Sequence, residues 1–252
     1  RLNRDLLGGT LEDLIPQLAA LLAAGQRRVI LDNTYATRVS RYPLIRTAHA
    51  HGVPVRCRYL ATPIDEAYAN VVNRILERHG KLLGPDELKE LGKDDPNLPP
   101  PAAMAKYAAS FEAPHVDEGF AVVEEVAFVR RADPQFTGKG LLLDVDGTLR
   151  KTRSGELFPR SAADVELLPG RREQLQRFVD EGYQLFLVSN QSGVASGTLS
   201  KEDAEAAFAR TIELLGLPIA EVVYCPHPAF PVGCFCRKPL PGLGVALAQQ
   251  LD

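Results

Sequence analysis

The chain has 252 residues and a formal net charge of −3, and 45% of its residues are hydrophobic and 24% are charged. This composition is ordinary for a folded globular protein and excludes a disordered or collagen-like chain. No apolar run reaches the roughly 18 residues of a membrane-spanning helix. Because the bulk charge does not attract phosphate, any contact with nucleic acid must come from a local patch.

The predicted elements alternate between strands and helices, which is typical of layered α/β domains. In the first half, strands are expected over residues 28–33, 54–60 and 121–130, and helices over residues 11–24, 40–50, 64–78 and 102–111. The proline-rich segment 92–101 (GKDDPNLPPP) fits neither a helix nor a central strand, so a loop is expected there.

The polar segment 132–140 (ADPQFTGKG) is the expected linker between two domains, residues 1–131 and 141–252. After the linker, strands are expected over residues 141–144, 184–188 and 220–224, and helices over residues 171–180, 201–215 and 243–251. The expected fold class is therefore α/β, with two three-layer domains whose sheets are mainly parallel.

The sharpest motif is LLLDVDGTL at residues 141–149, in which Asp144 and Asp146 follow an apolar strand. Residues two apart on an extended chain point to the same side, so both carboxylates converge where open α/β sheets place their sites. One carboxylate can attack phosphorus, and the other can protonate the leaving oxygen and then activate water. Such oxygen ligands also suit Mg²⁺.

Two further pieces follow in order, Ser189 in LFLVSNQSG and Lys238 in RKP. Together these motifs resemble the haloacid dehalogenase phosphatase superfamily over residues 140–252. The resemblance implies an aspartyl nucleophile, Asp144, an acid/base, Asp146, and phosphate and charge stabilisers, Ser189 and Lys238. It also implies that Thr148 and Asn190 contact phosphate, and that Asp144, the Val145 carbonyl and Asp146 bind Mg²⁺. A further acidic motif of the superfamily does not occur in these 252 residues, so its Mg²⁺ carboxylate is expected to be missing.

Only about 40 residues separate Asp146 from Ser189, which leaves no room for a large cap domain. We therefore expect an open site that is covered only by a short flap.

Cys225, His227, Cys234 and Cys236 form two pairs around a six-residue loop. Four such ligands suit tetrahedral Zn²⁺ without an open position, which indicates a structural site; a small cluster of buried thiols is the alternative. The clustering argues against a disulfide framework and for a reducing compartment, the cytoplasm. The segment CPHPAFPVGCFCRKP resembles the zinc loop of heptose-bisphosphate and histidinol-phosphate phosphatases, which implies that Arg237 lies near the substrate phosphate.

In the first half, Asp32 ends an apolar run, the position at which P-loop enzymes hold Mg²⁺ through water. With RLNRDLLGG at the start of the chain and FEAPHVDEGF at residues 111–120, this half resembles the kinase domain of polynucleotide 5′-kinase/3′-phosphatases over residues 1–131. The resemblance implies Asp5 as the base for a 5′-hydroxyl, Asp32 as the magnesium acid, and Arg38 or Arg41 as phosphate contacts. A solvated helix face explains these arginines equally well.

A complete kinase domain would use ATP, whose phosphates require a G-x-x-x-x-G-K-[ST] loop. That loop does not occur in the sequence, so we expect no ATP-dependent kinase activity from these 252 residues. Each half thus lacks one motif at its outer end, and the expectation is that both domains are truncated parts of a longer protein.

The leading hypothesis is an end-healing enzyme that removes 3′-phosphates and phosphorylates 5′-hydroxyls of DNA or RNA. The alternative is a small-molecule phosphatase of the heptose-bisphosphate or histidinol-phosphate type with a metabolite kinase-like domain. A catalytically inactive binding module is a third possibility. The expected partner is a phosphorylated substrate, including DNA or RNA ends; no membrane and no protein partner are predicted.

Overall fold

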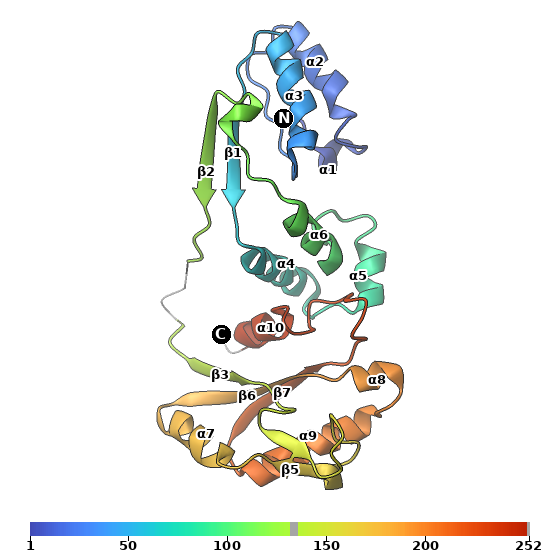
Figure 1. Ribbon diagram of the computed structural model, residues 1–252, viewed down its shortest axis with the longest axis vertical. Helices are drawn as coiled ribbons and strands as arrows, with labels where there is room; N and C mark the ends of the chain where they lie inside the picture. The colour runs from blue at the N-terminus through green and yellow to red at the C-terminus, as the bar shows by residue number, and fades with distance from the viewer. Residues whose placement is uncertain (132–135, 251–252) are drawn as a thin grey trace. The chain divides into compact units, whose positions relative to one another are not determined.

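A computed structural model describes residues 1–131 and 136–250 and shows a mixed α/β chain with mainly parallel sheets (Figure 1). Contacts between residues divide the chain into two compact units. One unit comprises Arg1–Ile64 and Ala103–Arg130, and the other comprises Asp65–Ala102 and Arg131–Asp252. Most of the predicted linker, residues 132–135, and the last two residues lie outside the described part. Among the described residues, no helix has the length and apolar character needed to cross a bilayer.

The first unit contains a two-stranded parallel sheet, in which β1 (Arg56–Ala61) pairs with β2 (Val122–Ala127) in register from Arg56–Val122 to Ala61–Ala127. Its helical elements are α1 (Arg4–Leu7), α2 (Leu14–Ala23), α3 (Arg38–Ala50), most of α6 (Pro101–Ser110) and the short 3₁₀ helix η1 (Val116–Glu118). Leucines at helical spacing on α2, Leu14, Leu18 and Leu22, are buried and pack in one core cluster with Leu44 and Ala48 of α3. The predicted helices 11–24 and 40–50 are confirmed.

The predicted strand at residues 28–33 is wrong. Among the described residues, this segment has one isolated bridge, Leu2 to Leu31. Hydrogen bonds from Leu2 N to Ile30 O (2.7 Å) and from Asp32 N to Leu2 O (3.0 Å) flank it. The sequence has the apolar pattern of a strand, but a strand also needs several consecutive residues of a neighbouring strand to pair with. In the described part of the chain, the backbone of residues 28–33 pairs only with that of Leu2.

The second unit is built on a three-stranded parallel sheet with the order β3 (Lys139–Leu143), β6 (Tyr183–Asn190) and β7 (Ile219–Cys225). Its helices are α4 (Ile64–His79), α5 (Pro85–Leu91), α7 (Arg171–Asp180), α8 (Ser192–Ser196), α9 (Lys201–Leu215) and α10 (Gly242–Gln250). A short antiparallel hairpin, β4 (Arg150–Thr152) with β5 (Val165–Leu167), follows the first strand; the 3₁₀ helix η2 (Ala162–Asp164) precedes β5.

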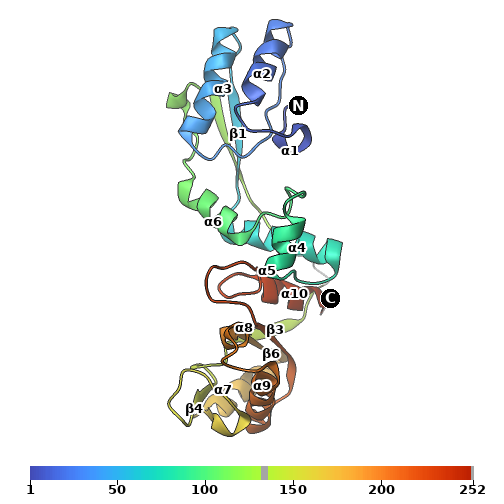
Figure 2. The same cartoon turned by 90° about the vertical axis from the view of Figure 1, so that its right-hand side faces the viewer.

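Helix α10 lies on one face of the three-stranded sheet, and α7 and α9 lie on the other (Figures 1 and 2). Alternate residues of the central strand β6 pack toward these two layers. Leu185 and Leu187 pack with residues of α7 and α9, whereas Phe186 and Val188 pack with Leu243 and Leu247 of α10. Burial on both faces explains why β6 reads as a continuous apolar run. This unit therefore has the predicted three layers, and the helices predicted over 171–180 and 201–215 have the observed bounds of α7 and α9.

The expected domain boundary remains a prediction, but the contacts group residues differently from it. Residues 65–102 carry α4 and α5 and cluster with the second unit, although the sequence analysis assigned them to the first half. Helix α5 was not predicted, and neither were α8 and the strands of the hairpin. All of these elements are short, between three and seven residues, so hydrophobic periodicity has little length over which to appear.

Candidate active site and metal centre

The predicted catalytic residues of the second unit meet at one edge of its sheet. Asp144 follows β3, and Ser189 and Asn190 are the last residues of the neighbouring strand β6. Because β3 and β6 are parallel, with Leu143 opposite Leu187, their carboxyl ends lie side by side. After Asp146 the chain turns back through Gly147, whose positive φ of 79° favours glycine.

Asp144 receives a hydrogen bond on each carboxylate oxygen. The Lys238 ammonium donates to Oδ1 and also to the Val188 carbonyl at 2.6 Å, and the Thr148 hydroxyl donates to Oδ2 at 2.8 Å. Burial alone raises the pKa of Asp144, but the hydrogen bonds from Lys238 and Thr148 outweigh it, so this pKa lies below its usual value. The lowered pKa favours the ionised carboxylate of Asp144, which is the form that a nucleophile attacking phosphorus needs.

Asp146 is held by two buried side chains that the sequence analysis did not single out. Arg150 Nε donates to Oδ1 at 2.7 Å, and Gln191 Nε2 donates to Oδ2 at 2.8 Å. Gln191 also donates to Ser189 Oγ at 2.9 Å, which leaves the Ser189 hydroxyl proton for another acceptor. Gln191 lies within the quoted LFLVSNQSG motif and Arg150 directly follows LLLDVDGTL, but no periodicity or charge pattern marks a buried polar partner.

The Val145 carbonyl, a predicted Mg²⁺ ligand, is occupied by hydrogen bonds of the turn. It accepts hydrogen bonds from Leu149 N (2.9 Å) and Arg150 N (3.1 Å) within the turn, and Val145 is fully buried. The carbonyl is thus committed to the backbone of the loop. Its role as a metal ligand stays a prediction, and it would require the carbonyl to give up these hydrogen bonds.

Two further predicted phosphate contacts, Asn190 and Arg237, differ in whether their side-chain atoms are free to bind a phosphate. Asn190 is engaged with the backbone of Lys238: its Oδ1 accepts from Lys238 N at 3.0 Å, and its Nδ2 donates to Lys238 O at 3.2 Å. Arg237 is different, because its Nη1 is buried and has no hydrogen-bond partner in the described part of the chain. An unpaired buried guanidinium nitrogen suits an anion.

The four predicted metal ligands lie together, with their ligand atoms within 4.8 Å of one another. Cys236 Sγ is 3.2 Å from Cys234 Sγ and 3.3 Å from Cys225 Sγ, and His227 Nδ1 is 3.1 Å from Cys236 Sγ. Sulfur atoms bound to a tetrahedral zinc ion, with Zn–S bonds of about 2.3 Å, are about 3.8 Å apart. The two observed sulfur–sulfur distances from Cys236 are about half an ångström shorter, so small side-chain shifts would make room for the ion. All the cysteines are free, and hydrogen bonds from Cys225 and Cys236 lower the pKa of Cys234. The cluster therefore fits a metal ion.

Residues 68–85 cover this cluster. Leu82 packs on the buried core that contains Cys225, Cys234 and Cys236, and the Tyr68 ring meets the Phe235 ring edge-on at 6.1 Å. At Gly233, an added Cβ would lie 3.0 Å from Pro85 Cβ. The metal loop, residues 225–236, is thus a surface on which α4 and α5 pack. It is also the segment that leads to Lys238.

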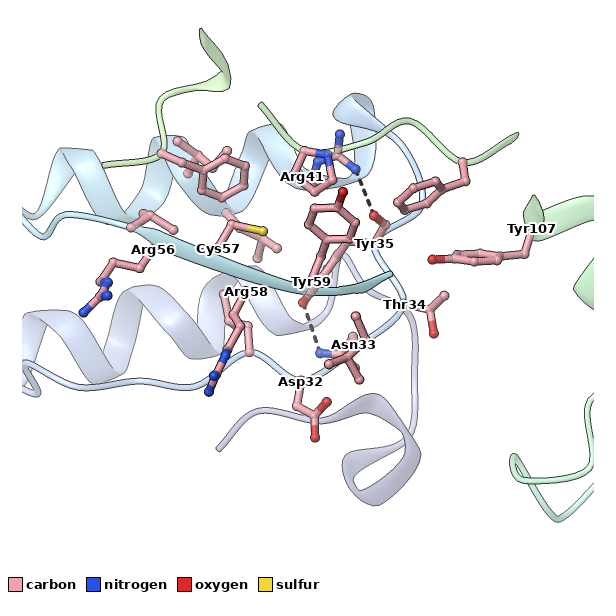
Figure 3. Close-up of a pocket in the computed structure, with 18 residues that line it drawn as sticks. Asp32, Asn33, Thr34, Tyr35, Arg41, Arg56, Cys57, Arg58, Tyr59 and Tyr107 are labelled. Carbon is pink, nitrogen blue, oxygen red and sulfur yellow. Dashed lines mark hydrogen bonds between the residues drawn. The ribbon is translucent and has the colours of Figure 1, made fainter. Parts of the chain in front are cut away.

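In the first unit, the structure brings the segments of Asp5 and Asp32 together. Arg4 N donates to the Asn33 side chain at 2.7 Å, and Asp32 forms an ion pair with Arg1. Asp32 and Asn33 line a cavity of about 340 Å³ together with Tyr35, Arg58 and Tyr59 (Figure 3). The roles of Asp5 and Asp32 in catalysis remain predictions.

The predicted phosphate contacts Arg38 and Arg41 are engaged by carboxylates around η1. Arg41 is buried and donates to Glu118 at 2.7 and 2.9 Å and to the Tyr35 carbonyl at 3.0 Å. Arg38 lies 3.3 Å from Asp117 in an exposed pair. A phosphate role for these arginines stays a prediction, and for Arg41 it would require the buried pair to separate.

Two family models match the chain. Residues 140–252 match the family described as polynucleotide kinase 3 phosphatase, and residues 4–91 match an AAA domain. A probable D-glycero-D-manno-heptose-1,7-bisphosphate 7-phosphatase from Thermoplasma volcanium is 31% identical over 112 residues, which cover 42% of this chain and 71% of that protein. The D-glycero-beta-D-manno-heptose-1,7-bisphosphate 7-phosphatase of Pseudomonas putida is 32% identical over 115 residues, which cover 44% and 64%.

A solved structure, the D,D-heptose 1,7-bisphosphate phosphatase of B. bronchiseptica complexed with magnesium and phosphate, aligns with a TM-score of 0.40. It is 30% identical, and the alignment covers 45% of this chain and 64% of that one. The chain thus spans less than two thirds of the length of this structure and of the Pseudomonas relative.

The Lys238→Met variant tests the electrostatics of Asp144. It removes the ammonium and its hydrogen bond, so we expect the pKa of Asp144 to rise, measured by a carbon-13 NMR titration of the carboxyl group. Lys151→Met is the matched control, because Lys151 pairs with Glu166 on the exposed hairpin at 3.0 Å. An Asp144 pKa that is the same in both variants would contradict the assignment.

Proposed function

Since the chain belongs to the haloacid dehalogenase family of phosphatases and also carries a kinase-like AAA domain, we propose that its second unit hydrolyses phosphate monoesters through a phosphorylated Asp144. The observation that carries this proposal is the arrangement around Asp144, where Lys238 and Thr148 bind its two oxygens. Ser189 and Asp146 lie at the same sheet edge, linked through Gln191.

In the first step, an Asp144 oxygen bonds to phosphorus as the bond from phosphorus to the ester oxygen breaks. Asp146 gives its proton to that departing oxygen. In the second step, water attacks the phosphorus, Asp146 takes the proton, and inorganic phosphate leaves with Asp144 restored. The Lys238 ammonium, the Ser189 hydroxyl and the buried Arg237 Nη1 are the donors that stabilise the charge on the phosphoryl oxygens.

At this edge of the sheet, the Asp144 carboxylate is the side chain that suits Mg²⁺. Asp144 is about half exposed and offers the hard oxygen ligand that Mg²⁺ prefers, whereas both Asp146 oxygens already accept hydrogen bonds. Bound Mg²⁺ would neutralise charge on the transferred phosphoryl group. We therefore assign the Asp144 side chain to metal and nucleophile, and the Asp146 side chain to proton transfer.

For the substrate, we propose the 3′-phosphate end of DNA or RNA. The β4–β5 hairpin that follows Asp146 has three residues in each strand; we propose it as the short flap of an open site, and an open site admits the end of a polymer. The family model over residues 140–252, named for a polynucleotide 3-phosphatase, and the AAA domain model on the same chain support this choice. The names of the curated relatives favour a second candidate, a heptose bisphosphate.

For a complete kinase-like domain, we propose a 5′-hydroxyl end as the acceptor and ATP as the donor, with Asp5 as the base and Asp32 as the acid that holds Mg²⁺ through water. These 252 residues contain no phosphate-binding G-x-x-x-x-G-K-[ST] loop, so we do not expect them to use ATP by themselves. Support comes from the bridge between Leu2 and Leu31. This bridge holds the segments of Asp5 and Asp32 beside each other.

The substrate proposal is tested by phosphate release from a 3′-phosphorylated oligonucleotide and from heptose 1,7-bisphosphate, with Mg²⁺ present. We expect a higher kcat/KM for the oligonucleotide, with loss of both activities in Asp144→Asn. Preference for the sugar would overturn the end-healing proposal. Hydrolysis of neither compound by the unmodified protein would overturn the phosphatase proposal itself.

We also propose that the cysteine–histidine cluster binds Zn²⁺ as a structural site. Purified protein should contain about one equivalent of zinc, as a closed four-ligand site would retain, and Cys234→Ser should lose it. Because α4 and α5 pack on the loop, hydrogen exchange in both helices should accelerate in this variant. Cys57→Ser is the matched control, since Cys57 lies outside the cluster in the other unit. Zinc content unchanged by Cys234→Ser would contradict this assignment.

A further inference from the structure

Arg150 is the most deeply buried charged side chain among the described residues, with 1% of its surface exposed. It directly follows the DGTL sequence and begins β4, the first strand of the β4–β5 hairpin. Burying a guanidinium is costly unless its donors are paired. Its neighbours therefore indicate what it does.

The guanidinium of Arg150 joins Asp146 to helix α9. Its Nε donates to Asp146 Oδ1 at 2.7 Å, and its Nη1 donates to the Thr211 hydroxyl at 2.9 Å. Thr211 is fully buried on α9, and its own hydroxyl donates to the Ala207 carbonyl at 2.7 Å. The central carbon of the guanidinium lies 4.9 Å from the centre of the Phe208 ring, also on α9, so packing and hydrogen bonds fix the same group.

We propose that Arg150 is a positioning residue for proton transfer, which holds the Asp146 carboxylate at the angle needed to reach the ester oxygen and the attacking water. The inference rests on the proposed function, because it takes Asp146 as the acid and base. Gln191 holds the other oxygen of Asp146. Arg150 connects the Asp146 carboxylate to α9, which carries none of the proposed catalytic residues. The position of α9 therefore determines where Asp146 delivers its proton.

The leaving group of the ester distinguishes a positioning role of Arg150 in proton transfer from a merely structural role. In the first step, the ester oxygen leaves from phosphorus as Asp144 bonds to it. An alkoxide needs the proton of Asp146 to leave, whereas p-nitrophenolate leaves without it. In the second step, Asp146 takes a proton from the attacking water for both esters. With the p-nitrophenyl ester, Asp146 still holds its proton after the first step and releases it to solvent before it acts as the base. A misplaced Asp146 therefore slows the first step for alkyl esters only, and the second step for both.

The experiment compares Arg150→Met with the unmodified protein on p-nitrophenyl phosphate and β-glycerol phosphate, in rapid-quench and steady-state modes. For the p-nitrophenyl ester we expect the first turnover to keep its rate while steady-state turnover falls on the order of 10–100-fold. For β-glycerol phosphate the first turnover itself should slow by a similar factor. Lys151→Met, the exposed neighbour on the same strand, should match the unmodified protein on both esters.

Thr211→Val provides a second variant that keeps the shape of the core and leaves Asp146 and Arg150 in place. It removes the oxygen that accepts from Arg150 Nη1, so the same pattern should appear with a smaller amplitude, even where Arg150→Met fails to fold. Equal slowing of the first turnover for both esters in the folded variants, or unchanged rates in Thr211→Val, would overturn the inference. An unmodified protein that hydrolyses neither ester would overturn the proposed function as well.

Discussion

The contact between Lys238 and Asp144 joins residues 94 positions apart, and the arrangement of the second unit depends on it. Asp144 stands at the end of β3, so its place follows from the sheet. Lys238 has no such support and reaches the site on a loop. Asn190 clamps the backbone of Lys238 from β6, and the cysteine–histidine cluster ends two residues earlier, at Cys236. The cation is therefore positioned by a side-chain amide on one side and a four-ligand cluster on the other.

The same loop links this site to a part of the chain with no evident catalytic motif. Tyr68 of α4 packs on Phe235 of the metal-binding loop, Leu82 between α4 and α5 packs on the buried core around the cysteines, and Pro85 at the start of α5 lies against Gly233. Close-packed protein interiors transmit displacements instead of absorbing them. In the first unit a comparable constraint acts on Arg41, whose buried pair with Glu118 ties α3 to η1. In both units, ion pairs between residues far apart in the chain hold loops that local sequence preferences leave free.

The sequence predicted the features that are local. The helices predicted over residues 171–180 and 201–215 have the bounds of α7 and α9, and the spacing of Asp144 and Asp146 after an apolar strand predicted a site at the carboxyl edge of the sheet. What it could not predict depends on partners far along the chain. Residues 28–33 have the strand pattern but lack a run of partners, the Val145 carbonyl turns into its own loop, and Arg150 pairs with a threonine 61 positions away.

The central claim is that Asp144 becomes covalently phosphorylated during turnover. The most direct measurement is mass spectrometry of protein that has been acid-quenched within the first turnovers of a phosphate monoester and then digested. The account predicts a phosphoryl group on the peptide that contains Asp144 and its disappearance when the substrate is exhausted. A phosphoryl group on another residue, or turnover without any phosphorylated peptide, would contradict it.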